Sequence, residues 1–166
     1  MLRAVLGLGS NIGDRRGNLA EAVRRLSETD GLDIVKTSSF YESAPVDYKD
    51  QPDFLNAAVA IDTTLKPEGL LEALKGIEKA MGRKETVDKG PRNIDIDILL
   101  YDIVEVRLPE LKVPHPGLKE RAFALIPLLE VAPEALLPNG QPVRWLLRQT
   151  DISGLKKISS PLRGED

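Results

Sequence analysis

Hydrophobic and polar residues follow one another along the chain in blocks that predict two kinds of element. Residues 4–8 form a short apolar run that leads into a glycine-containing turn, as is typical of a buried strand entering a loop. Apolar side chains then recur at helical spacing, at Leu19, Ala22, Val23 and Leu26. The pattern therefore predicts a strand followed by an amphipathic helix.

Two further strands follow this helix. Residues 32–41 are rich in β-branched and aromatic side chains and predict the second strand, whereas residues 43–52 carry two prolines and predict a loop. Residues 54–61 predict the third strand, in which successive side chains point to opposite faces. Phe54 and Asn56 therefore fall on the same face.

A second helix and a fourth strand complete the pattern. Pro67 occupies a first helical position, and apolar residues continue at helical spacing until Gly82 ends the element. A polar loop covers residues 83–92. In residues 94–99 three isoleucines alternate with Asp95, Asp97 and a leucine, so this strand has opposite chemistry on its two faces.

The order of elements is thus strand, helix, strand, strand, helix, strand. It predicts an α+β fold with a ferredoxin-like βαββαβ core, an antiparallel sheet and helices packed on one side of it. Shorter helical pieces around residues 117–129 and 142–148 predict a C-terminal extension. We expect residues 1–166 to form a single domain, with residues 159–166 as a polar, frayed tail.

Composition narrows the classes of function. The chain has no cysteine, which excludes disulfides, thiolate metal sites and cysteine nucleophiles. Its 23 basic and 26 acidic residues give a net charge of -3, so no overall field attracts nucleic acid or an anionic membrane. No apolar run is long enough to span a bilayer, and the amino terminus lacks the features of a signal peptide. We expect a cytoplasmic protein without nucleic-acid or membrane partners.

The strongest chemical signal is the pair of carboxylates in the fourth strand. Their spacing places Asp95 and Asp97 on one face with Cα atoms about 6 to 7 Å apart. Magnesium binds a few carboxylates together with water and substrate phosphates. Alternatively, the two side chains line the solvated face of an antiparallel strand. The spacing by itself leaves both interpretations open.

The glycines near the amino terminus are a weaker signal. Gly7 and Gly9 fit a dinucleotide-binding fingerprint, but its third glycine would fall at Ile12, and Gly13 comes one residue late. A tight turn after the first strand is therefore the simpler interpretation.

Other candidates are single residues, each with an ordinary structural explanation. Three arginines could bind phosphate through planar donors, namely Arg83, Arg92 and Arg121, although most arginines lie on solvated surface. His115 lies between two prolines, and a lone histidine is usually structural. Phe54 and Phe123 could enclose a flat ring, but phenylalanine more often packs in the core.

Four segments together resemble one enzyme family. They are residues 8–14 (LGSNIGD), 51–58 (QPDFLNAA), 90–99 (GPRNIDIDIL) and 113–115 (VPH). In this order and spacing they are similar to the 6-hydroxymethyl-7,8-dihydropterin pyrophosphokinases of folate biosynthesis, from the first strand to about Pro133.

The resemblance implies transfer of pyrophosphate from ATP to the hydroxymethyl group of the pterin, which releases AMP. It implies two Mg²⁺ ions per site, held by Asp95 and Asp97, with ATP as the co-substrate. The catalytic residues that it implies are Arg83, Arg92, Asp95 and Asp97. The residues implied for ATP binding are Glu78, Arg92, Ile98, His115 and Arg121. Those implied for the pterin are Ser43, Ala44, Pro45, Val46, Phe54, Asn56 and Phe123.

The chain also departs from the family pattern. Glu85 stands where a second loop arginine is frequent, Lys89 where tryptophan is frequent, and Phe54 where tyrosine is frequent. The resemblance further implies that residues 13–17, 43–52 and 82–89 form covers over the site.

Three possible functions therefore remain to be compared. The first is the pyrophosphokinase, which we expect to act as a monomer. The second is a non-catalytic ferredoxin-like module that binds a small ligand, and the third is an ordinary kinase that makes ADP. The adenine nucleotide released, if any, distinguishes them.

Overall fold

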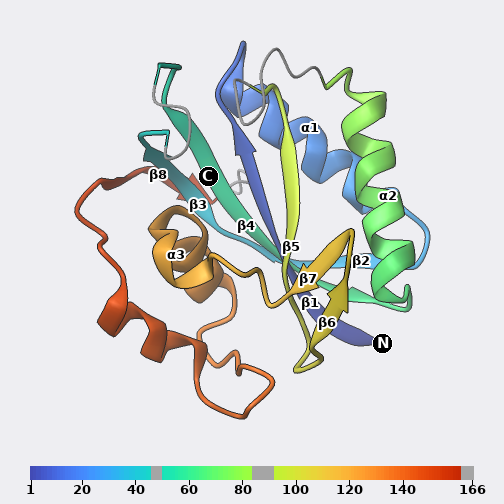
Figure 1. Cartoon of the computed structure of the whole chain (residues 1–166). Helices are drawn as coiled ribbons and strands as arrows, with labels where there is room; N and C mark the ends of the chain where they lie inside the picture. Colours follow the sequence, from blue (N-terminus) through green and yellow to red (C-terminus); the bar gives the residue numbers. More distant parts are fainter. Residues whose placement is uncertain (46–49, 84–91, 162–166) are drawn as a thin grey trace.

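The structure is a computed structural model that describes residues 1–45, 50–83 and 92–161. Its first half contains β1 (Leu2–Ser10), α1 (Arg15–Ser27), β2 (Leu32–Thr37), β3 (Ser39–Ser43), β4 (Phe54–Thr63), α2 (Pro67–Ala80) and β5 (Asp95–Tyr101) (Figure 1). The remainder contains β6 (Val106–Leu108), β7 (Leu111–Val113), η1 (Leu118–Glu120), α3 (Ala122–Val131), η2 (Val143–Gln149) and β8 (Leu155–Pro161).

One antiparallel sheet organises these elements. Its strand order is β5-β1-β4-β3-β8. β2 and β3 pair with the same edge of β4, β3 with residues 54–56 and β2 with residues 59–63. β6 and β7 form a separate hairpin. The chain order and the antiparallel pairing confirm the predicted ferredoxin-like core.

The face of the sheet under α1 and α2 carries the larger part of the core. α1 buries the predicted stripe of Leu19, Ala22, Val23 and Leu26, and its N-cap Asp14 accepts a hydrogen bond from the Gly17 N–H at 3.0 Å. α2 buries its own apolar stripe against the same face. These helices remove the aliphatic side chains of β1, β4 and β5 from water, which stabilises the fold.

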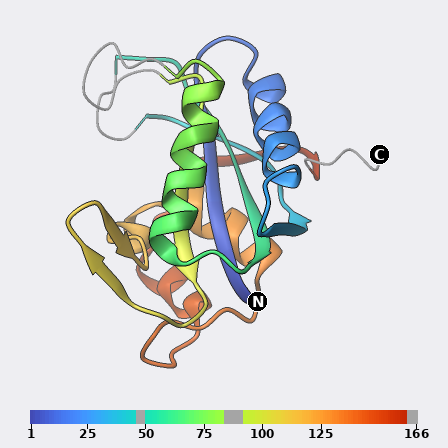
Figure 2. The same ribbon diagram turned by 90° about the vertical axis from the view of Figure 1, so that its right-hand side faces the viewer.

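α3, from the predicted C-terminal extension, covers the opposite face, while the two helices of the core, α1 and α2, lie together on one side as predicted. Figure 2 shows α1 and α2 in front of the sheet and α3, in orange, behind it. α3 packs on Ala58 and Ala60 of β4, whose small side chains allow the helix to approach the sheet closely. The alternation over residues 54–61 is confirmed, but both faces of β4 are buried.

The predicted second strand is interrupted at Ser38. The Ser38 hydroxyl accepts a hydrogen bond from the Ala58 N–H at 2.8 Å, and its own N–H donates to the Ala58 carbonyl at 2.9 Å. The register against β4 shifts here, which separates β2 from β3.

β8 was not predicted, because its polar sequence LKKISSP has no clear hydrophobic period. It pairs with β3, and residues 159–161, expected to begin a frayed tail, continue this strand. Residues 162–166 lie outside the described part of the chain.

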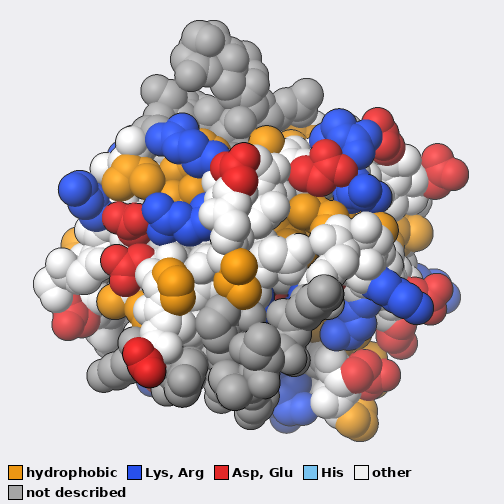
Figure 3. All heavy atoms as spheres, turned by 90° about the horizontal axis from the view of Figure 1, so that it is seen from above, with side chains coloured by type: hydrophobic (Ala, Val, Ile, Leu, Met, Phe, Trp, Pro, Cys, Tyr) orange, Lys and Arg blue, Asp and Glu red, His pale blue; other side chains and the backbone are white. Residues whose placement is uncertain are grey.

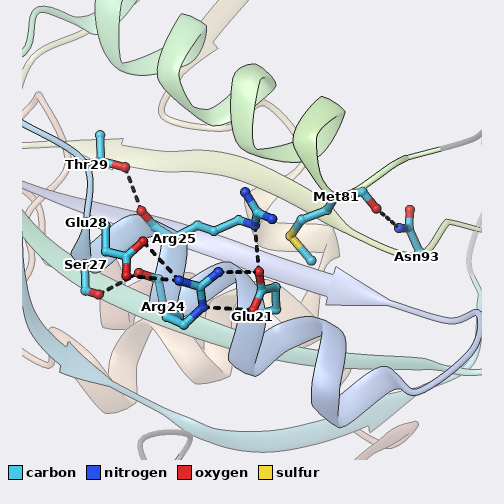
Figure 4. A network of polar contacts seen from close by, with 8 residues as sticks. All are labelled: Glu21, Arg24, Arg25, Ser27, Glu28, Thr29, Met81 and Asn93. Atoms are coloured by element: carbon cyan, nitrogen blue, oxygen red, sulfur yellow. Dashed lines mark hydrogen bonds and ion pairs between the residues drawn. The ribbon is translucent and has the colours of Figure 1, made fainter.

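The exposed side of α1 carries a network of ion pairs (Figure 4). Glu21 accepts hydrogen bonds from Arg24 at 2.6 Å and from Arg25 at 2.8 Å, and Arg24 also pairs with Glu28. Such exposed pairs contribute little to stability. Within residues 1–45, 50–83 and 92–161, no helix is long and apolar enough to cross a membrane.

Candidate functional site

A pocket of about 240 Å³ opens on the face of the sheet that carries α3. The chain brings β1, β4, β5, the end of β3 and the start of α3 together around it. The sequence-predicted site residues that line it are Ser43, Ala44, Phe54, Asn56, Arg92, Asp95, Asp97, His115, Arg121 and Phe123.

Two glycines of β1 form the floor of this pocket. Gly7 pairs with Asp97, and Gly9 lies between Asp95 on β5 and Asn56 on β4. A Cβ atom at Gly9 would lie 3.5 Å from the Phe54 ring and 3.6 Å from Asn56 Oδ1. These glycines thus lie within the strand and leave space above it, and the expected turn follows the strand, where Gly13 has a φ of 71°.

Asp95 and Asp97 are half-buried and line the pocket together, so they are more than a solvated strand face. Burial first, and then the neighbouring charges of Asp95 and Glu78, raise the pKa of Asp97 to about 7. Arg92 Nη1 lies 3.5 Å from Asp95 Oδ2, and Arg83 Nη1 lies 3.5 Å from Asp95 Oδ1. The arginines partly balance the carboxylates, and the pair still favours a further cation.

The donor set suits magnesium bound together with a phosphate substrate. Among the described residues, no group of three or more His, Asp or Glu side chains is placed to hold a metal ion. Two carboxylates in a pocket fit Mg²⁺, which keeps waters and takes phosphate oxygens rather than a complete protein cage. Asp95 and Asp97 could therefore supply the protein ligands of such a site.

Glu78 does not line the pocket, although the resemblance implied a contact with ATP. Its buried carboxylate accepts a hydrogen bond from the Ile96 N–H at 2.7 Å through Oε2 and from Arg83 Nη1 at 2.8 Å through Oε1. Burial raises the pKa of Glu78, and these two bonds oppose the shift. In this structure Glu78 thus joins α2 to β5 and holds Arg83 beside Asp95.

Two further sequence-predicted residues have side chains outside the pocket. Ile98 packs into the core under α1 and α2, on the face opposite the aspartates. Since the Ile96 N–H points away from β1 toward Glu78, the Ile98 backbone, two residues on, also faces the free edge of β5. A contact between Ile98 and ATP would therefore involve its backbone. Pro45 is buried and does not line the pocket, and Val46 lies outside the described residues.

At the other end of the pocket, Asn56 is held in one orientation. Its Nδ2 donates to the Tyr41 carbonyl at 3.2 Å and to Ser43 Oγ at 2.8 Å. The Tyr41 carbonyl can only accept, so it fixes which end of the amide is the NH₂ group. Both amide hydrogens are used inside the protein, and Asn56 offers a ligand only its Oδ1 acceptor. The expectation that this amide offers a donor and an acceptor was wrong.

His115 and Arg121 line the end of the pocket near the aspartates. Nδ1 of His115 accepts a hydrogen bond from the Gly117 N–H at 3.2 Å, so the imidazole carries its proton on Nε2. Burial and then the charge of Arg121 lower the pKa of His115, which favours the neutral ring. The Arg121 guanidinium lies 5.6 Å from the centre of the Phe123 ring.

Asn11 and Gln51 were missed as individual functional residues. Asn11 is 1% exposed, and its Nδ2 donates to Gln51 Oε1 at 2.9 Å and to the Pro52 carbonyl at 3.0 Å. Its Oδ1 accepts from the Arg92 N–H at 2.8 Å. Asn11 thereby joins Arg92 to Gln51, which lines the pocket. Their presence in the segments 8–14 and 51–58 of the family resemblance was the sequence signal for both residues.

A second amide fixes the segment that leads into β5. Nδ2 of Asn93 donates to the Met81 carbonyl at the end of α2, at 2.9 Å (Figure 4). Arg92 and Asn93 are therefore both anchored before the aspartates begin. Glu85 and Lys89, where the chain departs from the family pattern, lie outside the described residues.

Among the described residues, the face seen from the top of Figure 1 shows no concentration of one charge. In Figure 3, Lys and Arg side chains alternate with Asp and Glu side chains on this face. Such a mixed surface is unlike the basic stripe of a nucleic-acid-binding protein.

Comparison with known proteins assigns the chain to a family. A model of the family described as 7,8-dihydro-6-hydroxymethylpterin-pyrophosphokinase (HPPK) matches residues 5–133. This chain belongs to the HPPK family. It is therefore an ATP-dependent pyrophosphokinase of folate biosynthesis, and the HPPK resemblance seen in the four sequence segments is confirmed.

Relatives agree with this assignment over most of the chain. A 2-amino-4-hydroxy-6-hydroxymethyldihydropteridine pyrophosphokinase of Methylorubrum extorquens is 48% identical over 158 residues, covering 95% of this chain and 99% of the relative. The protein of that name from Aquifex aeolicus is 46% identical over 138 residues, covering 83% of this chain and 85% of the relative.

Some relatives are much longer than this chain. The folic acid synthesis protein fol1 of Schizosaccharomyces pombe is 41% identical over 158 residues, covering 95% of this chain and 22% of fol1. A Plasmodium falciparum HPPK-DHPS crystal structure with pteroate has a TM-score of 0.68 at 19% identity, covering 89% of this chain and 42% of that one. This structural likeness supports the HPPK fold.

Proposed function

We propose that the protein transfers pyrophosphate from ATP to the hydroxymethyl group of 6-hydroxymethyl-7,8-dihydropterin. The hydroxymethyl oxygen forms a bond to the β-phosphorus of ATP, the bond from this phosphorus to the α,β-bridging oxygen breaks, and the hydroxyl loses its proton. The products are AMP and the pterin pyrophosphate. The observation that carries the proposal is a single pocket with an aromatic, amide-containing end and a strongly charged end.

The aromatic end suits a flat heterocycle. Phe54 and Phe123 come from β4 and α3 and line the same pocket, so a ring between them would be stacked and removed from water. The fixed Oδ1 of Asn56 would accept a hydrogen bond from a ring N–H or an exocyclic amine. Ser43 and Ala44 complete this end.

The charged end suits a triphosphate. Asp95 and Asp97 would hold two Mg²⁺ ions, which neutralise phosphate charge and align the attacking and leaving oxygens when bound. Arg92 and Arg121 would bind phosphate oxygens through their planar donors, and Nε2–H of neutral His115 would donate a further hydrogen bond. Arg83 lies beside Asp95 and could reach the same phosphates.

Strands β1, β4 and β5 provide a rigid platform for both ends of the pocket. Asn56, Gly9 and Asp95 follow one another across three paired strands. Such a platform favours transfer because alignment and charge stabilisation supply most of the catalysis in phosphoryl-type reactions.

The test is to identify the nucleotide product. The protein is incubated with ATP, Mg²⁺ and the reduced pterin, and AMP and ADP are separated chromatographically. We expect AMP to accumulate in step with the pterin pyrophosphate. Accumulation of ADP would indicate an ordinary kinase, and no nucleotide product would support the non-catalytic ligand-binding module. A monomeric state and a cytoplasmic location remain predictions, which gel filtration and cell fractionation would test.

A further inference from the structure

Glu130 is the only charged residue of α3, and its carboxylate is bonded to the sheet. Oε2 accepts hydrogen bonds from the Ser39 N–H at 3.0 Å and from Ser39 Oγ at 2.9 Å. Oε1 accepts from the Tyr41 hydroxyl at 2.7 Å. Ser39 and Tyr41 are 2% and 6% exposed. One carboxylate thus connects an otherwise apolar helix to β3 through three hydrogen bonds.

These bonds differ in kind from the other contacts of α3. The apolar packing of α3 on β4 is non-directional and tolerates small shifts of the helix. Hydrogen bonds to a carboxylate are short and directional, so they fix both the separation and the register of the two elements. Glu130 therefore determines where α3 lies along β3.

The same two elements form walls at the aromatic end of the pocket. Phe123 precedes Glu130 by two helical turns on the same side of α3, about 10 Å along the axis. Ser43 follows Tyr41 by two residues, on the same face of β3, and also lines the pocket. A shift of α3 relative to β3 would move the Phe123 ring relative to Ser43.

Tyr41 links Glu130 to Asn56, the residue that offers a polar contact in the slot between Phe54 and Phe123. Its hydroxyl donates to Glu130, and its carbonyl accepts one of the two hydrogen bonds that orient Asn56. Glu130 thus influences the position of Phe123 on α3 and of β3, the strand that orients the Asn56 amide.

We propose that Glu130 is a positioning residue, which sets the width of the slot between Phe54 and Phe123 and thereby the affinity for the pterin. The proposal rests on the proposed function, since it assigns this slot to the pterin. A purely stabilising role would lower the stability of the fold without a preference for one substrate.

The test compares Glu130→Gln and Tyr41→Phe with a matched control, Glu134→Gln. Glu134 is an exposed glutamate four residues further along the chain. For each protein, kcat and KM are measured for the pterin and for ATP, and thermal unfolding is recorded. Because charged hydrogen bonds are lost, we expect Glu130→Gln to raise the pterin KM about fivefold to tenfold and the ATP KM by less than about twofold.

Tyr41→Phe, the double variant and the control Glu134→Gln distinguish positioning by Glu130 from a general loss of structure. Tyr41→Phe removes a single hydroxyl, keeps the ring packing and should raise the pterin KM in the same direction by about twofold to threefold. In the double variant the effects should not add, because both substitutions act on the same hydrogen bond: Glu130→Gln removes the charge of its acceptor and Tyr41→Phe removes its donor. Glu134→Gln should leave both KM values unchanged.

The outcomes separate this proposal from the proposed function. If wild-type protein makes no AMP, the proposed function is wrong. If wild-type protein makes AMP but folded Glu130→Gln and Tyr41→Phe keep the wild-type pterin KM, only the role of Glu130 is overturned. An equal rise of both KM values would also overturn it, because it would indicate a general loss of structure.

Discussion

The two faces of the sheet differ in chemistry although they share the same strands. Ile94, Ile96 and Ile98 point toward α1 and α2 and pack in an apolar core. Asp95 and Asp97, which alternate with them, point into the pocket near α3. Tight aliphatic packing supplies stability on one face, and the other face keeps space and charge for a ligand. Stability and chemistry should therefore respond to different substitutions in one strand.

The largest effect is expected from removing a carboxylate. Asp95→Asn and Asp97→Asn should each slow AMP formation by about 10²-fold or more, since several kcal/mol of charge stabilisation would be lost. Thermal unfolding should show folded proteins, because neither side chain supports the core. Activity near the wild-type level in both variants at ordinary magnesium concentration would disprove the assignment of these residues to the metal.

The matching substitution on the other face should act on stability. Ile96→Ala should lower the free energy of unfolding by about 2 to 5 kcal/mol, since it leaves a cavity in the core under α2. Chemical denaturation measures this change, and the KM values of the folded protein should stay near those of the wild type. The comparison between the faces would fail if Ile96→Ala altered pterin binding without a loss of stability.

Within the pocket, Phe123→Ala tests the aromatic end separately from the charged end. Loss of stacking and burial should weaken pterin binding by about 1 to 3 kcal/mol, while ATP affinity changes little. Equilibrium titrations with each ligand give the two values. An equal loss for both ligands would instead indicate that Phe123 supports the fold.

Arg83→Ala is expected to have a smaller effect. Arg83 is held by Glu78 and lies beside Asp95, so its removal should slow the transfer step by about 10-fold, equivalent to about 1.4 kcal/mol. Single-turnover kinetics are required because product release can limit the steady state. Arg83→Lys is the matched control, and it should retain part of the rate. An unchanged single-turnover rate in Arg83→Ala would remove this arginine from the mechanism.

A separate effect, on stability and not on turnover, should be a pH dependence of stability in the metal-free protein. The pKa of Asp97 is raised from 3.8 to about 7 in the folded state, so the folded protein binds this proton more tightly than the unfolded chain does. Stability from this group is then fully present below pH 3.8 and is lost progressively as the pH rises to and through about 7. Asp97→Asn should remove this slope from denaturation curves measured at several pH values, and an identical slope in both proteins would contradict the shift.

Sequence patterns predicted the fold well where side chains follow a period. The helical stripes and the alternation in β4 and β5 record which face is buried, because burial selects apolar residues at fixed spacing. β8 has no such period, and the position of α3 depends on a face of β4 whose alanines gave no indication of a covering helix.

The sequence motifs predicted which residues belong to the site, but not which partners their side chains contact. The four motifs indicated Asp95, Asp97, Phe54 and Asn56, and the structure brings all four to one pocket. Glu78 is an exception, because the family resemblance implied a nucleotide contact, whereas its carboxylate accepts hydrogen bonds from Ile96 and Arg83.

The sequence by itself thus determined the order of elements, the chemistry of each strand face and the family. Only the tertiary structure decided which polar groups remain available to a ligand. Asn11, Asn56 and Glu130 each form hydrogen bonds with partners at least 13 residues away in the chain. Hydrogen bonds depend on the distance and direction between such partners, and these are fixed only when the sheet and α3 have assembled.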